Sequence, residues 1–261
     1  MGDTVLQWLD RVRAAELDSI LVRANGLEGK VLEIGGGTGS QAAALQRRGV
    51  DITSIEMAAS NYRHARVFPM IEYDGVHIPF EDETFDTLFS SNVLEHVPHL
   101  DILQTEMMRV LKPKGRAIHV MPSHTWRLWS NVTHYVSLMQ KLISFSGGVR
   151  VAEGSSSGAS DPSQAASPSL ASRLKRAVIP ARHGERGNAF TEVFYFRPSW
   201  WRNHFEKAGW IVEDVSPVPL FYTGYMVLKG RLDLSSRRKL AGYFGSASTC
   251  FILSKSGNAG D

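Results

Sequence analysis

The sequence contains a single cysteine, Cys250, among its 261 residues. One thiol excludes an intramolecular disulfide framework and a zinc site built from several cysteines, and it fits a cytoplasmic protein. The chain also lacks any run of 18 consecutive apolar residues, so no membrane-spanning helix is expected. Its first charged residue, Asp3, is acidic and no apolar stretch follows, so no signal peptide is expected.

The chain as a whole also lacks a strong excess of positive or negative charge, but its two halves differ in net charge. Residues 1–122 carry 12 Lys and Arg against 17 Asp and Glu, whereas residues 123–261 carry 17 against 9. The isoelectric point near 9.0 therefore reflects a basic second half. No RNA-binding module accompanies it, so no nucleic-acid partner is predicted.

The first 122 residues show a regular alternation of strand and helix patterns. Alternation of this kind predicts a parallel sheet with helices on both faces. Asp101 is the expected N-cap of the helix before the fifth strand. The predicted strands are 30–34, 52–55, 70–73, 85–90 and 116–121, and the predicted helices are 3–23, 40–48, 60–66 and 101–111.

The alternation ends after Pro122. Residues 125–145 are aromatic and apolar, which predicts either a cap helix over the site or a lid that admits a hydrophobic acceptor or touches a membrane. Residues 151–172 are 17 Ser, Ala, Gly or Pro out of 22, which predicts a disordered loop. A helix at 197–208 and strands at 210–215 and 248–254 are expected to follow.

A glycine-rich turn follows the first predicted strand. Gly35-Gly36-Gly37-Thr38-Gly39 lies between a strand and a helix, and its glycines permit positive φ and close approach of a ligand. The spacing is G-x-G-x-G, whereas a dinucleotide fingerprint is G-x-G-x-x-G.

Two acidic residues flank this turn. Glu33, two residues before Gly35, would repel the negative charge of a pyrophosphate but suits a ligand that bears an ammonium and a sulfonium. Glu56 ends the second strand, 17 positions after Gly39, where a carboxylate can accept hydrogen bonds from both hydroxyls of a ribose.

Four stretches in this order and spacing resemble class I S-adenosylmethionine-dependent methyltransferases. The resemblance is to the ubiquinone/menaquinone-biosynthesis-like group, also called methyltransferase type 11, and covers about residues 28–122, with a faint return at 205–210. The stretches are 31–39, 52–56, 74–86, and 91–97 with 109–115.

The resemblance implies an α/β fold. It is a Rossmann-like, seven-stranded, mainly parallel sheet with helices on both faces, an antiparallel last strand, and a helical and disordered insertion between strands five and six. Residues 1–122 would form the S-adenosylmethionine-binding core, 123–196 the substrate-side insertion, and 197–261 the rest of the same sheet.

The resemblance also assigns the cofactor-binding residues. Glu33 and the glycine turn would face the methionine part, Glu56 the ribose and Asp74 the adenine amino group, while the segment from Asn92 would line the cleft near the sulfonium. The full set is Glu33, Gly35, Gly36, Gly37, Gly39, Glu56, Met57, Asp74, Gly75, Asn92 and Val93.

Methyl transfer from a sulfonium mainly requires alignment of donor and acceptor, and a base helps only when the acceptor must lose a proton. His96 and His124 are the candidate catalytic bases, and His134 and His183 are further histidines on the substrate side. Some relatives bind a divalent metal through a Glu followed by Glu-His. Because Asn92 holds the first position of that pattern and is a poorer cation ligand, no metal is predicted.

The acceptor is expected to be a small molecule or lipid-like, methylated on oxygen rather than carbon or nitrogen. Enzymes that methylate nucleobase amino groups carry an Asn/Asp-Pro-Pro-aromatic turn, where this chain has Ser91-Asn92-Val93-Leu94. Peripheral membrane contact through 125–145 stays open, as does the oligomeric state. The alternatives are a nicotinamide-dependent oxidoreductase and a non-catalytic cofactor-binding module of the same fold.

Overall fold

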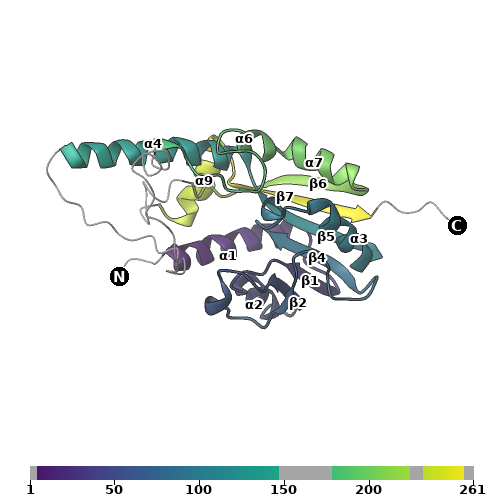
Figure 1. Cartoon of the computed structure of the whole chain (residues 1–261). Helices are drawn as coiled ribbons and strands as arrows, with labels where there is room; N and C mark the ends of the chain where they lie inside the picture. The colour runs from purple at the N-terminus through teal and green to yellow at the C-terminus, as the bar shows by residue number, and fades with distance from the viewer. Residues whose placement is uncertain (1–4, 147–177, 224–231, 256–261) are drawn as a thin grey trace, which may run out of the picture.

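The computed structural model describes residues 5–146, 178–223 and 232–255 (Figure 1). A seven-stranded sheet in the order β3-β2-β1-β4-β5-β7-β6 forms its centre. The first five strands are parallel, and β7 is antiparallel to both β5 and β6. The strands are β1 Lys30–Ile34, β2 Asp51–Met57, β3 Ile71–Tyr73, β4 Phe85–Ser91, β5 Leu111–Pro122, β6 Trp210–Val218 and β7 Ser248–Lys255.

Apolar residues that alternate along the strands form a core on each face of the sheet. Leu32 of β1 faces a core shared with Leu103 of α3 (Leu100–Val110) and Trp201 of α7 (Pro198–Lys207). Its neighbour Val31 faces a core shared with Ile20 of α1 (Val5–Arg23) and Leu45 of α2 (Ser40–Gln46). The predicted fold class, a Rossmann-like sheet covered on both faces, is therefore confirmed.

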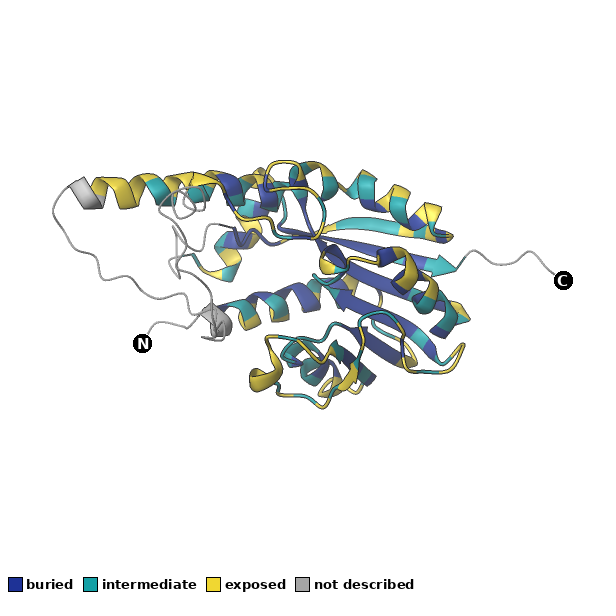
Figure 2. Cartoon of the chain, viewed as in Figure 1, coloured by how far each residue is buried: buried dark blue, intermediate teal, exposed yellow. Residues whose placement is uncertain are grey.

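The long helix α4, His124–Ser146, follows β5 and extends beyond the sheet (Figure 1). Its first turns are anchored, because Arg127 and Asn131 are buried. The outer part is largely exposed, as Figure 2 shows in yellow. The apolar residues predicted at 125–145 are thus helical, and several are exposed by 40% or more: Leu128, Val132, Val136, Met139 and Leu142.

Several predicted boundaries were wrong. The expected N-cap Asp101 lies inside α3, which begins at Leu100 after His99 without a side-chain cap. The predicted helix 60–66 is only the 3-10 turn η1, Arg63–Ala65. The fifth strand begins at Leu111, because that residue already pairs with Phe85 before a register shift. The loop predicted for 151–172 lies outside the described residues.

The helix α9, Leu234–Phe244, had not been predicted. Asp233 caps it by accepting a hydrogen bond from Ser236 N at 2.7 Å. An Asp directly before the first apolar residue of a helix is a readable N-cap signal. The short helix α6, Glu192–Tyr195, lies in a segment beyond the predicted disordered loop for which no helix was predicted from the sequence.

Candidate functional site

The glycine loop, Gly35–Gly39, leaves β1 at the carboxyl edge of the parallel strands. Gly35, Gly37 and Gly39 all have positive φ, between 59° and 80°, which only glycine adopts without strain. A Cβ on Gly35 would lie 2.5 Å from a methyl of Val93, so glycine also permits this close approach. The sequence-predicted residues Gly35 and Val93 therefore meet in the structure.

Glu33 lies beneath the glycine loop, only 2% exposed, and its Oε2 accepts a hydrogen bond from Ser54 Oγ at 2.6 Å. Burial, with a smaller contribution from the nearby Glu56, raises the pKa of Glu33 to about 7 against the lowering effect of the Ser54 bond. A Cβ on Gly36 would lie 2.1 Å from Ser54 Oγ. Glu33 therefore supports the loop from below and is partly protonated at neutral pH.

Glu56 lies near the end of β2, beside the glycine loop. Its Oε2 accepts from Gly37 N at 2.6 Å and its Oε1 accepts from Met57 N at 2.8 Å. The carboxylate is thus held at the edge where a ribose was expected. Met57 in turn lies against Gly75, where a Cβ would come within 3.2 Å of the Met57 sulfur.

Asp74 follows β3 and closes a turn. Its Oδ1 accepts from Val76 N at 2.8 Å and His77 N at 2.7 Å, and its Oδ2 contacts His77 Nδ1 at 2.8 Å. These bonds, led by the one from the His77 side chain, lower the pKa of Asp74 to about 2. Both oxygens are therefore occupied within the turn, and an adenine amino group would have to share them.

Asn92 begins the turn after β4 with a φ of 56°, and its N–H donates to Val120 O at 2.8 Å. This bond ties the turn to β5. The 3-10 turn η2, Leu94–His96, follows and buries Glu95 to 1% exposure. The structure thereby brings the predicted residues Asn92 and Val93 to the glycine loop and turns Glu95 inward.

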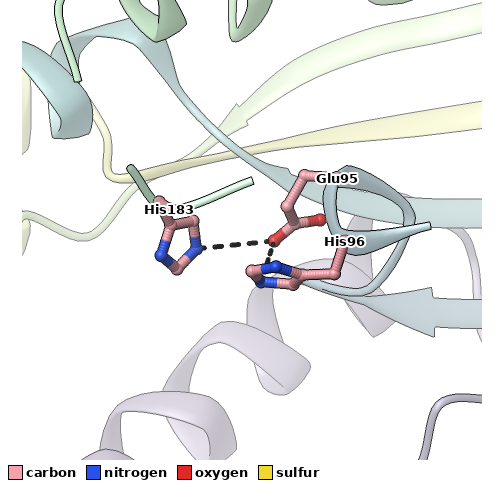
Figure 3. Close-up of side chains that lie close together, drawn as sticks. All are labelled: Glu95, His96 and His183. Atoms are coloured by element: carbon pink, nitrogen blue, oxygen red, sulfur yellow. Dashed lines mark ion pairs between the residues drawn. The ribbon is translucent and has the colours of Figure 1, made fainter. Parts of the chain in front are cut away.

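Glu95, His96 and His183 form a group that we call the Glu95 cluster (Figure 3). Glu95 Oε1 lies 3.6 Å from His96 Nε2 and 3.7 Å from His183 Nε2, and the three ligand atoms are within 4.8 Å of one another. Burial lowers the pKa of His96 below its usual range. The sequence had not joined His183 to this pair, because no local spacing connects residues so far apart along the chain.

The segment that carries His183 is held by a buried ion pair. Arg127 Nε of α4 lies 2.8 Å from Glu192 Oε2 of α6. The other oxygen of Glu192 accepts from His183 N and Gly184 N, both at 2.7 Å. A Cβ on Gly184 would lie 2.8 Å from Glu95 O, so glycine lets this segment cross directly over η2.

The second predicted base, His124, lies in the first turn of α4. Burial lowers its pKa, and the positive charge of Arg197 lowers it further. Its Nδ1 is buried and forms no hydrogen bond with any of the described residues. Neither an ion pair nor a ring contact joins His124 to the Glu95 cluster in the described part of the chain.

Residues 32–119 match a family described as a methyltransferase domain. An uncharacterized methyltransferase of Mycobacterium sp. (strain JLS) is 38% identical over 98 residues, 34% of this chain and 36% of the relative. The biotin biosynthesis bifunctional protein BioHC of Cellvibrio japonicus is 32% identical over 117 residues, 41% of this chain and 23% of that protein. The match thus spans about a third or less of these curated relatives.

Solved structures share the fold. A SAM-dependent methyltransferase from Aquifex aeolicus aligns with a TM-score of 0.51 at 14% identity, covering 95% of both chains. A chain from the complex of the Haloferax volcanii Trm112 methyltransferase activator with a methyltransferase has a TM-score of 0.53 at 13% identity, over 92% of this chain and 88% of that one. Residues 32–119 are thus similar to the methyltransferase domain of that family, and the curated relatives matched over the same part of the chain include methyltransferases.

Proposed function

We propose that this chain transfers the methyl group of S-adenosylmethionine to a small or lipid-like acceptor, on oxygen rather than on carbon or nitrogen. The observation that carries the proposal is the contact between Glu56 Oε2 and Gly37 N at 2.6 Å. It puts a carboxylate and a positive-φ glycine loop together at the carboxyl edge of adjacent parallel strands, where open α/β sheets bind their ligands.

The residues of this edge fit the cofactor. A carboxylate at the end of β2 can exchange its bond to Gly37 N for a ribose hydroxyl, and a loop without side chains lets the methionine part approach the backbone. Glu33, with a pKa of about 7, can ionise when an ammonium group approaches. We assign Glu33, Glu56, Met57, Asp74, Gly75, Asn92 and Val93, with the loop glycines, to cofactor binding.

S-adenosylmethionine supplies an electrophilic methyl group on a sulfonium. The acceptor oxygen forms a bond to the methyl carbon as the carbon–sulfur bond breaks, and that electron pair stays on sulfur. The hydroxyl proton must pass to a base. The pKa values of His96 and His124 are both lowered, so both imidazoles are neutral near pH 7 and can accept a proton.

Two features support a small or lipid-like acceptor. The exposed apolar residues of α4, among them Leu128, Met139 and Leu142, offer a surface for a hydrophobic molecule or for peripheral membrane contact. The basic excess of residues 123–261 lies in the same part of the chain. We therefore assign 123–196 to the substrate side and 1–122 with 197–261 to the sheet.

Other expectations stay predictions, namely the ubiquinone/menaquinone-like subgroup, a cytoplasmic location and the absence of a nucleic-acid partner. None of the helices in the described ranges has the length and apolar character needed to cross a bilayer.

The experiment is incubation of the full chain with a small-molecule and lipid extract and methyl-labelled S-adenosylmethionine, followed by mass spectrometry. A compound that gains label in the presence of the wild type but not of Glu56→Ala supports the proposal and identifies the acceptor. Cofactor binding without any labelled compound would favour the non-catalytic module. Binding of reduced nicotinamide dinucleotide without S-adenosylmethionine binding would favour an oxidoreductase.

A further inference from the structure

We propose that Glu95, His96 and His183 bind one divalent transition-metal cation. The site was not predicted from the sequence, in which Asn92 replaces the first ligand of a known pattern. It is assembled only when the 178–191 segment crosses η2 and brings His183 to the Glu95–His96 pair (Figure 3).

The carboxylate of Glu95 is buried without a hydrogen-bond partner among the described residues. Its side chain is 1% exposed, and neither of its oxygens accepts a hydrogen bond from any described residue. The nearest side-chain nitrogens, on His96 and His183, are 3.6 and 3.7 Å away, too far for hydrogen bonds. A buried carboxylate without compensation costs several kcal/mol, and a bound cation removes that cost.

The separations suit ligands arranged around a metal ion. Metal bonds of about 2.0–2.2 Å to imidazole nitrogen and carboxylate oxygen put tetrahedral ligands about 3.3–3.6 Å apart. The separation of 3.6 Å lies at the upper end of that range and the one of 3.7 Å just beyond it, and all three ligand atoms are within 4.8 Å of one another. Small side-chain rotations therefore complete the geometry.

The donor set identifies the class of cation. Two imidazoles and one carboxylate suit zinc, manganese, iron or cobalt, whereas magnesium and calcium prefer all-oxygen sites. Three protein ligands also leave coordination positions open, as in catalytic rather than structural metal sites.

The surroundings hold the ligands in place. The His183 ring packs edge-on against Trp126, with centroids 4.7 Å apart, and the His96 ring lies 4.7 Å from His183. The His183 and Gly184 amides are bound by Glu192, and Glu185 N donates to Glu95 O at 2.8 Å. Outer contacts of this kind orient metal ligands and maintain their affinity.

The bound cation would activate the methyl acceptor, a role that rests on the proposed function. Glu95 lies two residues beyond Val93, which meets the glycine loop at Gly35. A cation held by Glu95, His96 and His183 would lower the pKa of an acceptor hydroxyl bound to it, so that the hydroxyl would release its proton to water before its oxygen takes the methyl group. His96 then acts as a ligand rather than as a base, and the acceptor class is a hydroxyl compound that binds metals through oxygen.

The test is titration of the metal-free full chain with Co²⁺, followed by its visible absorption, and with Zn²⁺ by calorimetry. We expect one equivalent to bind. Glu95→Gln and His96→Ala should each weaken binding by more than about 100-fold, because loss of outer contacts alone typically costs about 10–100-fold. His96 is 44% exposed, so its removal should leave the fold intact. His99→Ala, an exposed histidine three residues away, is the matched control and should bind as the wild type does.

Absence of stoichiometric binding in the wild type would overturn the inference, and so would equal binding by the wild type, Glu95→Gln and His96→Ala. Thermal unfolding of each variant shows whether it is folded. S-adenosylmethionine affinity measured on the same metal-free samples separates the two proposals. Cofactor binding without metal binding contradicts only the metal site, and metal binding without cofactor binding contradicts only the proposed function.

Discussion

The glycine loop and the Glu95 cluster both lie at the carboxyl ends of the central strands, but different contacts build them. The loop, Glu33 and Glu56 are held by β1, β2 and the turn between them, through bonds such as Ser54 Oγ to Glu33. The Glu95 cluster instead depends on a segment from beyond α4, fixed by Arg127 and Glu192. The first region should therefore tolerate damage to the second, and substitutions can test this independence.

The largest effect is expected from Arg127→Met. This change leaves the carboxylate of Glu192 buried without its partner, which costs about 3–5 kcal/mol. For a domain of this size the melting temperature should fall by about 10 °C. Differential scanning calorimetry measures the loss. The double variant Arg127→Met/Glu192→Gln removes both charges and should regain part of it. Equal melting of the wild type and Arg127→Met would show that the ion pair does not hold this region.

Glu33→Gln tests the glycine-loop side through pH. The folded pKa of Glu33, about 7, is above the ordinary carboxyl value of 4.5, so its stabilising contribution is complete below pH 4.5 and is lost as pH rises through 7. Stability of the wild type should fall over this window by on the order of 3 kcal/mol relative to Glu33→Gln. Urea unfolding of both proteins at pH 5 and pH 8 gives the difference. Parallel pH profiles would contradict the buried, protonated state of Glu33.

Glu56→Ala should weaken S-adenosylmethionine binding by about 100-fold, or about 2.8 kcal/mol, which lies within the range of about 1.5–3 kcal/mol for one hydrogen bond to a charged group. The fold should be retained, and so should metal binding at the Glu95 cluster. Calorimetry measures the affinity. Glu72→Ala, a carboxylate on the neighbouring strand β3 that pairs with Arg66, is the control of equal charge. An unchanged affinity in Glu56→Ala would remove the ribose assignment.

Asp74→Asn should have the smallest effect, less than about tenfold on cofactor affinity. The amide oxygen of Asn can still accept from Val76 N and His77 N, so the turn is preserved while the charge is lost. Asp74→Ala removes the turn bonds as well and should cost more. Equal affinities in the two variants would mean that the turn bonds of Asp74 do not support the cofactor site.

The local features of the glycine-loop side could be predicted. Glu33, the glycine loop and Glu56 belong to a strand–turn–helix–strand unit whose spacing fixes where each residue lies. The role of Asp74 was harder to foresee, because its bonds to Val76 and His77 compete with a ligand. The helix α9 was missed although Asp233, directly before its first residue, is a typical N-cap, so its start could be predicted from the local sequence.

The sequence by itself determined the order of the strands and of the helices α1, α2, α3 and α7, the positive-φ glycines and the acidic residues at the strand ends, because these depend on contacts between near neighbours. Only the tertiary structure decided that His183 meets Glu95 and His96, and that Arg127 and Glu192 hold it there. The reason is physical. Side chains from distant segments meet only after the sheet and α4 have packed, and no local period or spacing encodes that meeting.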